Sequence, residues 1–592
     1  MTPSNKIRID ARYCKGVNTF NDSSEIHDNE IQTGNNIVVD TLGKIKKRLG
    51  ANKVLNDPGG RPVVALGYFN APNVDERMVQ VQDTAIYDST LPLATSGSWT
   101  DRTGSNTITA DQYATDMTVC DDKLFITNGK DYVHYHNGAG IIEEGDENTD
   151  PPFCKIGCYH KNRYWLFNET GRATVTGDVT TYTASAGDKL KIIIDGATTF
   201  DDIDLEGDET IADAVTSINA VDGFSAKGLA WKDSSGYLRI SSLTTGMGSS
   251  VTVADGGAGN GGECEDLFDG STASATGNEN PEWGYYSNAL APATFNRSTQ
   301  VFKAESGDAT EITAAVPLGD SIYIFKESSI HELIVQGATA TYWNLRPVER
   351  SRGCISYYCA KPYKGVIYYF YRDGIGGLGG EDIPIGVKST WDTINWDYVN
   401  RSRMVIWDDK LLLSVPTSQN YPDTVLVYDF LTKAWSVWSG IYVNCWGVFV
   451  EKTAGSAGAE EENLMYGHSN DGWIYQLGKS TQYNDDSSAI DLDIVTKDYD
   501  AGRPDTYKHG GWFYLRIITG PDTADTAITV YASIDGGSYS TLGTTKTTTK
   551  FSLFHLGRFK KIKFRIRHNA TASTQIVLNG YSAELYISDA TE

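Results

Sequence analysis

A hairpin-like phrase recurs along the chain at a nearly constant interval. Each copy has a polar pair, an apolar and aromatic run, a small polar turn and a second apolar run, as in DDKLFITNGKDYVHYHNG from Asp121. The steps between the seven copies are 45, 40, 159, 44, 45 and 53 residues. A repeat of about 40–45 residues built from β-strands is typical of propeller blades. The register positions are Met78, Lys123, Arg163, Ile322, Val366, Leu411 and Leu464.

The single long step predicts an inserted domain. Without residues 171–280, which are 110 residues long, the step of 159 becomes about 49. This segment has 18 Asp and Glu against 6 Lys and Arg, a net charge of −12. Residues 189–205 predict two strands joined by an Asp-Gly turn, residues 209–221 an amphipathic helix capped by Thr210 or Asp208, and residues 223–246 two more strands. We expect a small α+β domain that projects from a propeller of six or seven blades, the latter formed by residues 61–170 and 281–480.

Residues 1–60 are expected to form a loosely structured docking segment. The segment is acidic around residues 25–32 and basic at residues 43–50. The basic run is the candidate for docking on an acidic partner, and the alternative interpretation is a solvated loop plus one strand at residues 35–40. The candidate docking residues are Lys44, Lys46, Lys47 and Arg48.

After a polar linker, residues 490–592 predict a C-terminal antiparallel β-sandwich. In its strand KIKFRIRH, four cations alternate with apolar residues, so all four fall on one face. This face is either an exposed sheet surface or a docking surface for an acidic neighbour, for which the acidic insert of another copy is a candidate. The four cations are Lys561, Lys563, Arg565 and Arg567.

Composition excludes some functions. A formal net charge of −25 argues against a protein that binds nucleic acid by neutralising phosphates. The charge fits either plain solubility or a surface past which DNA slides without sticking. The eight scattered cysteines favour reduced thiols in a protein made in a cytosol. We find neither a stretch of about 20 apolar residues for a membrane-spanning segment nor an apolar signal-peptide core.

Enzyme chemistry has little support in the sequence. G-x-S-x-G, H-E-x-x-H and P-loop patterns are not found. The single stretch SIDGGSY at residues 533–539 resembles a sialidase Asp box but fits a hairpin turn. The Asp pairs 121–122 and 408–409 occupy equivalent repeat positions, which favours turns, and Cys154, Cys158 and His160 are too few to hold zinc. We predict no catalytic, cofactor-binding or metal-ligating residues.

Several stretches, taken in their order, resemble one family. Residues 16–50 contain the phrase D-x-x-G-x-hydrophobic-x-K-R-x-G, and IGCYHKNRYWLF at 156–167, WGYYSNALAPATFN at 283–296 and RGCISYYC at 352–359 follow. The chain resembles the tail nozzle and hub proteins of short-tailed bacteriophages, a family that includes tail tubular protein B and packaged-DNA stabilisation protein. The insert resembles modules of flagellin and flagellar hook-associated proteins, which decorate outer surfaces.

The resemblance implies a structural protein of a bacteriophage virion tail. In that family the protein forms a homo-oligomer ring, usually a hexamer, below the portal and adaptor proteins. Tail fibres or spikes are further partners, and genomic DNA passes through the lumen without sequence-specific binding. Two alternatives stay open: a tail-associated carbohydrate-active propeller enzyme, or an adhesin whose insert binds a host receptor.

Overall fold

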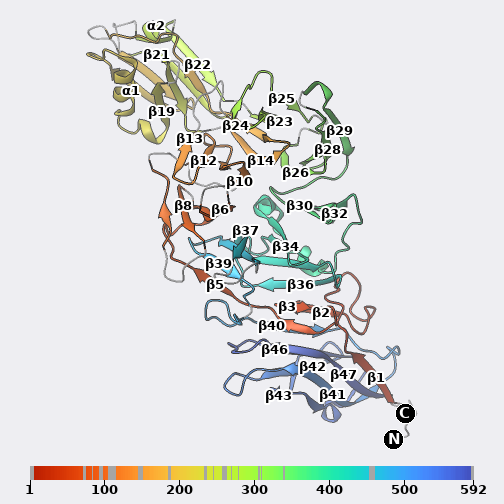
Figure 1. Cartoon of the computed structure of the whole chain (residues 1–592). Coiled ribbons are helices and arrows are strands. Elements are labelled where there is room, and N and C mark those ends of the chain that lie inside the picture. The colour runs from red at the N-terminus through yellow and green to blue at the C-terminus, as the bar shows by residue number, and fades with distance from the viewer. Residues whose placement is uncertain are drawn as a thin grey trace.

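The chain is described by a computed structural model of its 592 residues. The described residues are all except 1–5, 71–74, 83, 92–97, 105–107, 109–114, 144–150, 185–188, 233–235, 245, 257–262, 269, 278, 305–306, 309, 338–339, 453–459, 480 and 588–592. Figure 1 shows three parts in a row: the insert at one end, a propeller in the middle, and a β-sandwich with both chain termini at the other end. No helix among the described residues is long and apolar enough to cross a bilayer.

Seven antiparallel groups of strands form the propeller blades; six are separate small sheets, and blade 6 is part of a larger sheet. The first three are blade 1 with β6 (Val63–Phe69), β7 (Arg77–Gln82), β8 (Ala85–Thr90) and β9 (Thr100–Asp101); blade 2 with β10 (Asp116–Cys120), β11 (Lys123–Thr127), β12 (His134–His136) and β13 (Ile141–Glu143); and blade 3 with β14 (Cys154–His160), β15 (Arg163–Thr170), β23 (Glu279–Asn288), β24 (Ala291–Phe295) and β25 (Val301–Lys303).

The chain continues around the ring with four more blades. These are blade 4 with β26 (Ile312–Leu318), β27 (Ser321–Lys326), β28 (Ile330–Ile334) and β29 (Asn344–Glu349); blade 5 with β30 (Ala360–Tyr363), β31 (Val366–Tyr371) and β32 (Gly374–Leu378), followed by α3 (Lys388–Trp391); blade 6 with β33 (Arg403–Trp407), β34 (Lys410–Val415), β35 (Thr424–Asp429) and β36 (Ala434–Ser439); and blade 7 with β37 (Val443–Lys452), β38 (Glu460–His468), β39 (Ile474–Leu477) and β5 (Ala51–Val54).

The ring closes on itself. The innermost strands of consecutive blades lie side by side from β6 through β10, β14, β26, β30 and β33 to β37, and β37 contacts β6 again. All seven register positions fall in the second strand of a blade, from Met78 in β7 to Leu464 in β38. The hairpin period therefore predicted the propeller correctly, and the number of blades is seven.

The insert is a domain with its own core, as predicted. It contains a sheet of order β16-β20-β19 and a second of order β18-β17-β21-β22, around 20 buried apolar residues that are separate from the propeller cores. Thr210 caps the main helix by accepting a hydrogen bond from the Asp213 N–H. Sequence reasoning missed three of the strands and one helix. The elements are β16 (Thr174–Thr176), β17 (Lys189–Ile194), β18 (Thr198–Asp204), α1 (Ile211–Asn219), β19 (Gly228–Lys232), β20 (Leu238–Ser242), β21 (Ser250–Asp255), α2 (Glu263–Phe268) and β22 (Thr272–Thr276).

The expectation of a loose leader at residues 1–60 is wrong. Four of its strands belong to the C-terminal sandwich: β1 pairs with β47, β3 and β4 extend the same sheet, and β2 pairs with β40. A fifth, β5, is the outer strand of blade 7. The sandwich strands are β1 (Lys6–Ala11), β2 (Ile31–Asn35), β3 (Ile37–Val39), β4 (Ile45–Lys47), β40 (Leu492–Thr496), β41 (Lys508–Thr519), β42 (Ile528–Ile534), β43 (Ser540–Thr545), β44 (Thr549–Ser552), β45 (Arg558–Phe559), β46 (Ile562–His568) and β47 (Val577–Ile587).

Strand β2 joins the propeller to the sandwich. It lies between β36 of blade 6 and β40 of the sandwich, so one sheet of nine strands runs through both domains in the order β33-β34-β35-β36-β2-β40-β46-β42-β43. One buried apolar cluster likewise includes Phe325 of blade 4, Leu413 of blade 6 and Phe564 of the sandwich. The two domains therefore share a core as well as a sheet.

A buried guanidinium fixes this junction. Arg48 binds both carboxylate oxygens of Asp485 at 2.8 and 2.5 Å, and its Nε donates to Asn36 Oδ1 at 2.8 Å. It also donates to the carbonyl of Ser439, the last residue of β36, at 3.2 Å. This Arg48 clasp (Arg48, Asn36, Ser439 and Asp485) ties the N-terminal segment, blade 6 and the interdomain linker to one side chain. The Arg48 side chain is 1% exposed.

We predict that Arg48→Ala destabilises the chain by about 3–5 kcal/mol, because it leaves the Asp485 carboxylate without its cation in a mostly buried place. The measurement is the midpoint of thermal unfolding, Tm, by differential scanning calorimetry. Arg12→Ala is the control, since Arg12 forms an exposed pair with Asp10. Equal Tm values for the two variants would contradict the role given to the clasp.

Candidate functional site

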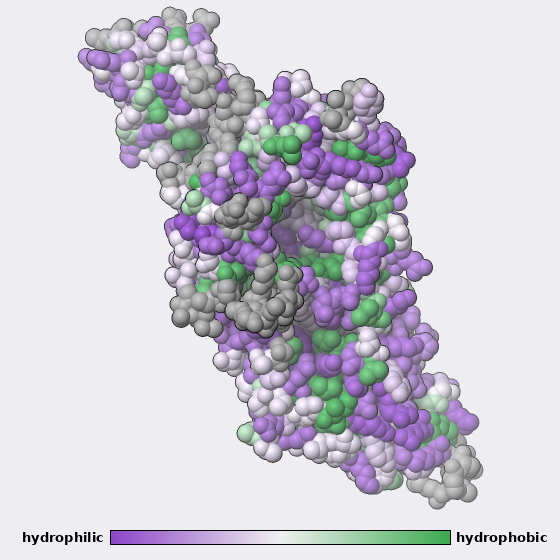
Figure 2. All heavy atoms as spheres, viewed as in Figure 1, coloured by the Kyte–Doolittle hydropathy of each residue, from purple (hydrophilic) through white to green (hydrophobic). Residues whose placement is uncertain are grey.

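The innermost strands of the propeller surround a narrow axial space, which we call the tunnel. Two cavities of about 310 and 290 Å³ lie along it, and both are lined by Asp116, Met117, Tyr358 and Lys361. Figure 2 shows the hollow at the centre of the propeller, surrounded by hydrophilic and hydrophobic side chains. Spaces of this size accommodate small molecules, and a DNA duplex does not fit them.

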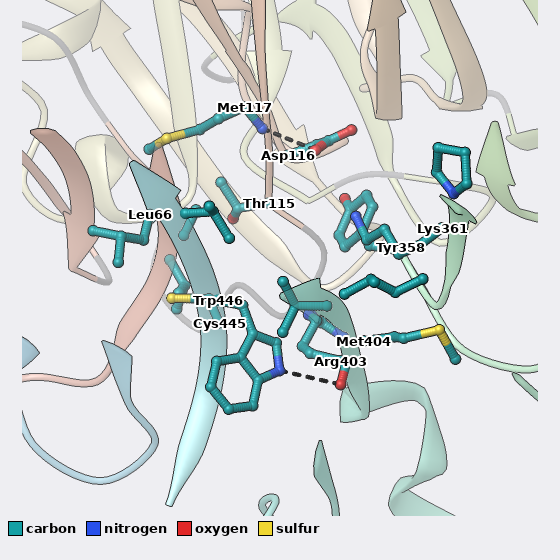
Figure 3. A pocket seen from close by; sticks show the side chains of 16 residues that line it. Leu66, Thr115, Asp116, Met117, Tyr358, Lys361, Arg403, Met404, Cys445 and Trp446 are labelled. Atoms are coloured by element: carbon teal, nitrogen blue, oxygen red, sulfur yellow. Dashed lines mark hydrogen bonds between the residues drawn. The ribbon is translucent and has the colours of Figure 1, made fainter. Parts of the chain in front are cut away.

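Asp116 on β10 is one of the charged groups in the tunnel wall (Figure 3). Its two carboxylate oxygens accept hydrogen bonds from the N–H groups of Gly157 at 3.0 Å and Met117 at 2.9 Å. Burial raises the pKa of Asp116 above its usual range, although these bonds and the charges of Lys361 and Arg403 act in the opposite direction.

Arg403 and Tyr358 are held in place by the surrounding blades. The Arg403 guanidinium donates to the carbonyls of Asn400 and Ser402 at 3.1 and 2.8 Å, and it lies 5.3 Å from the centre of the Tyr358 ring. The Tyr358 hydroxyl donates to the Lys155 carbonyl at 2.6 Å. These side chains are therefore fixed parts of the wall.

The tunnel does not resemble a hydrolase site. Asp116 is the one carboxylate among the described residues that line the two cavities, whereas glycoside hydrolysis by the common mechanisms uses a pair. Nowhere in the described part of the chain do three His, Cys, Asp or Glu side chains gather as a metal site would require. All eight cysteines are buried and free.

Of the four cations at residues 44–48, two are buried and two stay partly accessible. Lys47 and Arg48 are each 1% exposed, so their prediction as surface docking residues is wrong. The Lys47 ammonium lies 3.3 Å from both His568 Nδ1 and the Ala570 carbonyl, and burial lowers the pKa of Lys47 to about 8. Lys44 and Lys46 stay partly accessible, with Lys46 paired to Asp40 at 3.4 Å, and docking through them stays a prediction.

The cations of β46 and its flank do lie on one face, where they alternate with buried residues. Each is paired within the chain, at nitrogen–oxygen distances from 2.6 to 3.6 Å, with a carboxylate on or beside the neighbouring strand β40. Their charge is thus balanced locally, and docking through this face also stays a prediction. The pairs are Lys561–Asp498, Lys563–Asp498, Arg565–Asp493 and Arg567–Asp491.

The Asp-box-like stretch and the Asp pairs lie in hairpin turns, and the close pair of cysteines lies inside a blade. Asp535 and Gly536 form the tight turn between β42 and β43, with φ values of 49° and 77°. Asp121 and Asp408 have φ values of 52° and 50° at the turns between the first two strands of blades 2 and 6. Cys154 and Cys158 lie on β14 inside blade 3.

Sequence reasoning missed a buried charge network between blades 1 and 2. The Asp88 carboxylate is fully buried and lies 2.9 Å from Arg77, 3.0 Å from Arg102 and 2.9 Å from His136 Nε2. Burial acts to raise the pKa of Asp88, but the hydrogen bonds and the two guanidinium charges outweigh it, and the pKa lies below its usual range. No local motif reveals this network, because His136 is 48 positions from Asp88.

We predict that Asp88→Asn lowers Tm at neutral pH and that the difference from the wild type shrinks below about pH 4. A carboxyl whose pKa is lowered on folding stabilises the protein above its unfolded pKa, and this stabilisation is lost as pH falls through the folded value. The check is calorimetry of both proteins from pH 3 to pH 7, with Asp320→Asn, which removes an exposed carboxylate, as the control. A gap that is independent of pH would contradict the assignment.

Comparisons with known proteins add only the general fold. No family model and no curated protein matches the chain. Among solved structures, BamB from Moraxella catarrhalis is 9% identical, with 74% of this chain and 99% of that chain covered and a TM-score of 0.33. The WD40 domain of Neurospora crassa Pan2 is 7% identical, with coverages of 74% and 97% and a TM-score of 0.30. A glycoside hydrolase is 8% identical, with coverages of 89% and 100% and a TM-score of 0.19. Similarities of this strength carry no argument about function.

Proposed function

We propose that the chain is a structural protein of a bacteriophage tail. In this proposal several copies form a ring that continues the DNA channel below the portal and adaptor, retains the packaged genome and conducts it during ejection. The observation that carries the proposal is the structural role of the stretch that resembles the tail nozzle family. That stretch, residues 16–50, supplies β2, β3, β4 and the Arg48 clasp, which hold the propeller against the sandwich.

The individual positions of the resemblance support this. Asp40 accepts hydrogen bonds from the N–H groups of Leu42 and Lys44 at 2.9 Å each, and Gly43 completes the turn at a φ of 71°. At Gly50, any Cβ would collide with the carbonyl oxygen of Asn484 in the linker. Arg48 and Gly50 of this stretch thus contact the linker between the two domains, and a well-defined domain junction suits the subunit of a ring.

The size of the tunnel decides where DNA would pass. Because the two cavities on the propeller axis are too small for a duplex, the DNA channel of the proposed ring is the space enclosed by several subunits. A closed cyclic arrangement has no open end at which further copies add. The net charge of −25 suits a wall past which a polyanion slides, since like charges leave no favourable resting place.

The test is negative-stain microscopy and light scattering of the purified chain, alone and mixed with the adaptor protein of the same particle. We expect rings in at least the mixture. A chain that stays monomeric with its adaptor would contradict the proposal. Incubation with host surface polysaccharide tests the enzyme alternative, and we expect no depolymerised product.

The insert offers a sharp test of the adhesin alternative. It leaves and rejoins blade 3 at neighbouring positions, because Thr170 pairs with Glu279 across β15 and β23. Replacement of residues 171–278 by a short Gly-containing turn should therefore leave the propeller folded. We predict that this variant still assembles into particles, as a surface decoration allows. Loss of assembly would contradict the decorative role, whereas particles that assemble but no longer bind host cells would support the adhesin.

A further inference from the structure

A further cavity lies outside the propeller axis. It is a groove of about 900 Å³ between the N-terminal segment, blade 5 and blade 6. Its volume is within the range of about 300–1,000 Å³ that is usual for ligand sites.

Aromatic rings form the floor of this groove, which we call the Phe430 groove. The Phe430 ring lies 4.9 Å from Tyr368 of blade 5 and 5.5 Å from Tyr428, and Tyr428 lies 5.1 Å from Trp435. Phe20 from the N-terminal segment adds a further ring at the edge, and its side chain is 67% exposed. Trp435 and Tyr428 are only 3% and 7% exposed, so the accessible rings of the groove are Phe20, Tyr368, Tyr371 and Phe430, which come from three separate parts of the chain.

Main-chain hydrogen bonds hold the walls together. The N–H of Val17 donates to the Trp435 carbonyl at 2.9 Å, and the N–H of Thr19 donates to the Gly386 carbonyl at 2.7 Å. Trp435 Nε1 donates to the Pro384 carbonyl at 2.7 Å. At Gly386 a Cβ would lie 2.5 Å from the Trp435 ring and 2.6 Å from the Val17 carbonyl, so only glycine permits this approach. The groove is therefore formed before any ligand binds, which reduces the entropy cost of binding.

Exposed polar side chains of both signs surround the aromatic floor. Asp373 and Glu381 supply acceptors, and Lys15 and Lys433 supply donors. None of the four forms an ion pair with another described residue. Lys433 is held at a φ of 56°, a conformation in which a non-glycine residue is strained. Two further carboxylates of the lining are engaged within the chain: Glu30 accepts hydrogen bonds from Asn18 and from the His27 N–H, and Asp382 pairs with Arg352 at 2.7 Å. Among the described lining groups, two ammonium and two carboxylate groups are therefore left without an ion pair.

These features select a class of ligand. A charged ligand would meet like charges on part of the rim, and a purely apolar one would leave the polar rim without partners. A peptide that binds as an added strand needs free main-chain groups, but the carbonyls of Pro384, Gly386 and Trp435 already accept hydrogen bonds within the chain. A neutral sugar ring has C–H groups on its faces and hydroxyls at its edge, which match an aromatic floor and a mixed polar rim.

We propose that the Phe430 groove binds a neutral oligosaccharide, which lies on the aromatic floor and hydrogen-bonds through its hydroxyls to Asp373, Glu381, Lys15 and Lys433. This is a binding site and not a hydrolytic one. It does not depend on the ring function proposed above, because every residue of the groove comes from a single copy of the chain.

The experiment is an array of bacterial surface polysaccharides printed together with maltohexaose, cellohexaose and chitohexaose, probed with the full chain. Calorimetric titration with the glycan that gives the strongest signal follows. We expect at least a ten-fold loss of affinity in Phe20→Ala and in the double variant Asp373→Asn/Glu381→Gln. These three side chains are exposed, so the variants should keep the Tm of the wild type.

Phe554→Ala is the matched control, since Phe554 is an exposed phenylalanine, 53% accessible, on the sandwich. It should bind as the wild type does. The proposal would be overturned if no glycan on the array binds the wild type, or if the double variant binds the same glycan as the wild type does. A signal that Phe554→Ala reduces equally would also overturn it. A peptide array whose signal is abolished by the groove variants would assign the site to a protein partner instead.

Discussion

The ion pair between Arg48 and Asp485 is the interaction on which the shape of the molecule depends. A guanidinium in this position has five N–H donors to satisfy, and it distributes them over the N-terminal segment, the end of blade 6 and the linker to the sandwich. Because these three segments are far apart in the chain, one side chain holds the domain junction. The continuous sheet through β36, β2 and β40 makes the same connection through the main chain.

The same N-terminal segment also closes the propeller. Strand β5 follows directly after the clasp and pairs with β39, so blade 7 is built from both ends of the propeller sequence. A ring closed in this way cannot open without breaking that pairing. The first 55 residues therefore take part both in closing the propeller and in joining it to the sandwich. The Phe430 groove depends on the same segment, because its third wall is the chain between β1 and β2.

Features with short-range causes were predicted well. Each blade repeats one hairpin, so the register positions marked the second strands of all seven blades. The insert helix was predicted with its Thr210 cap as one of two candidates, and the one-sided placement of Lys561, Lys563, Arg565 and Arg567 followed from strand alternation. Features with long-range causes were missed. Lys47 and Arg48 look like surface charges in the sequence, but His568 and Asp485, which are 521 and 437 positions away, contact them in a buried place.

The sequence by itself determined the hairpin rhythm, the inserted domain and the terminal sandwich, because each depends on side-chain patterns within a few tens of residues. Tertiary structure alone decided that residues 1–60 belong to two domains, that small cavities lie along the propeller axis, and that aromatic rings from three segments meet in one groove. The physical reason is that strand pairing and burial between distant segments depend on which surfaces come into contact in the fold. Local sequence patterns do not specify those long-range contacts.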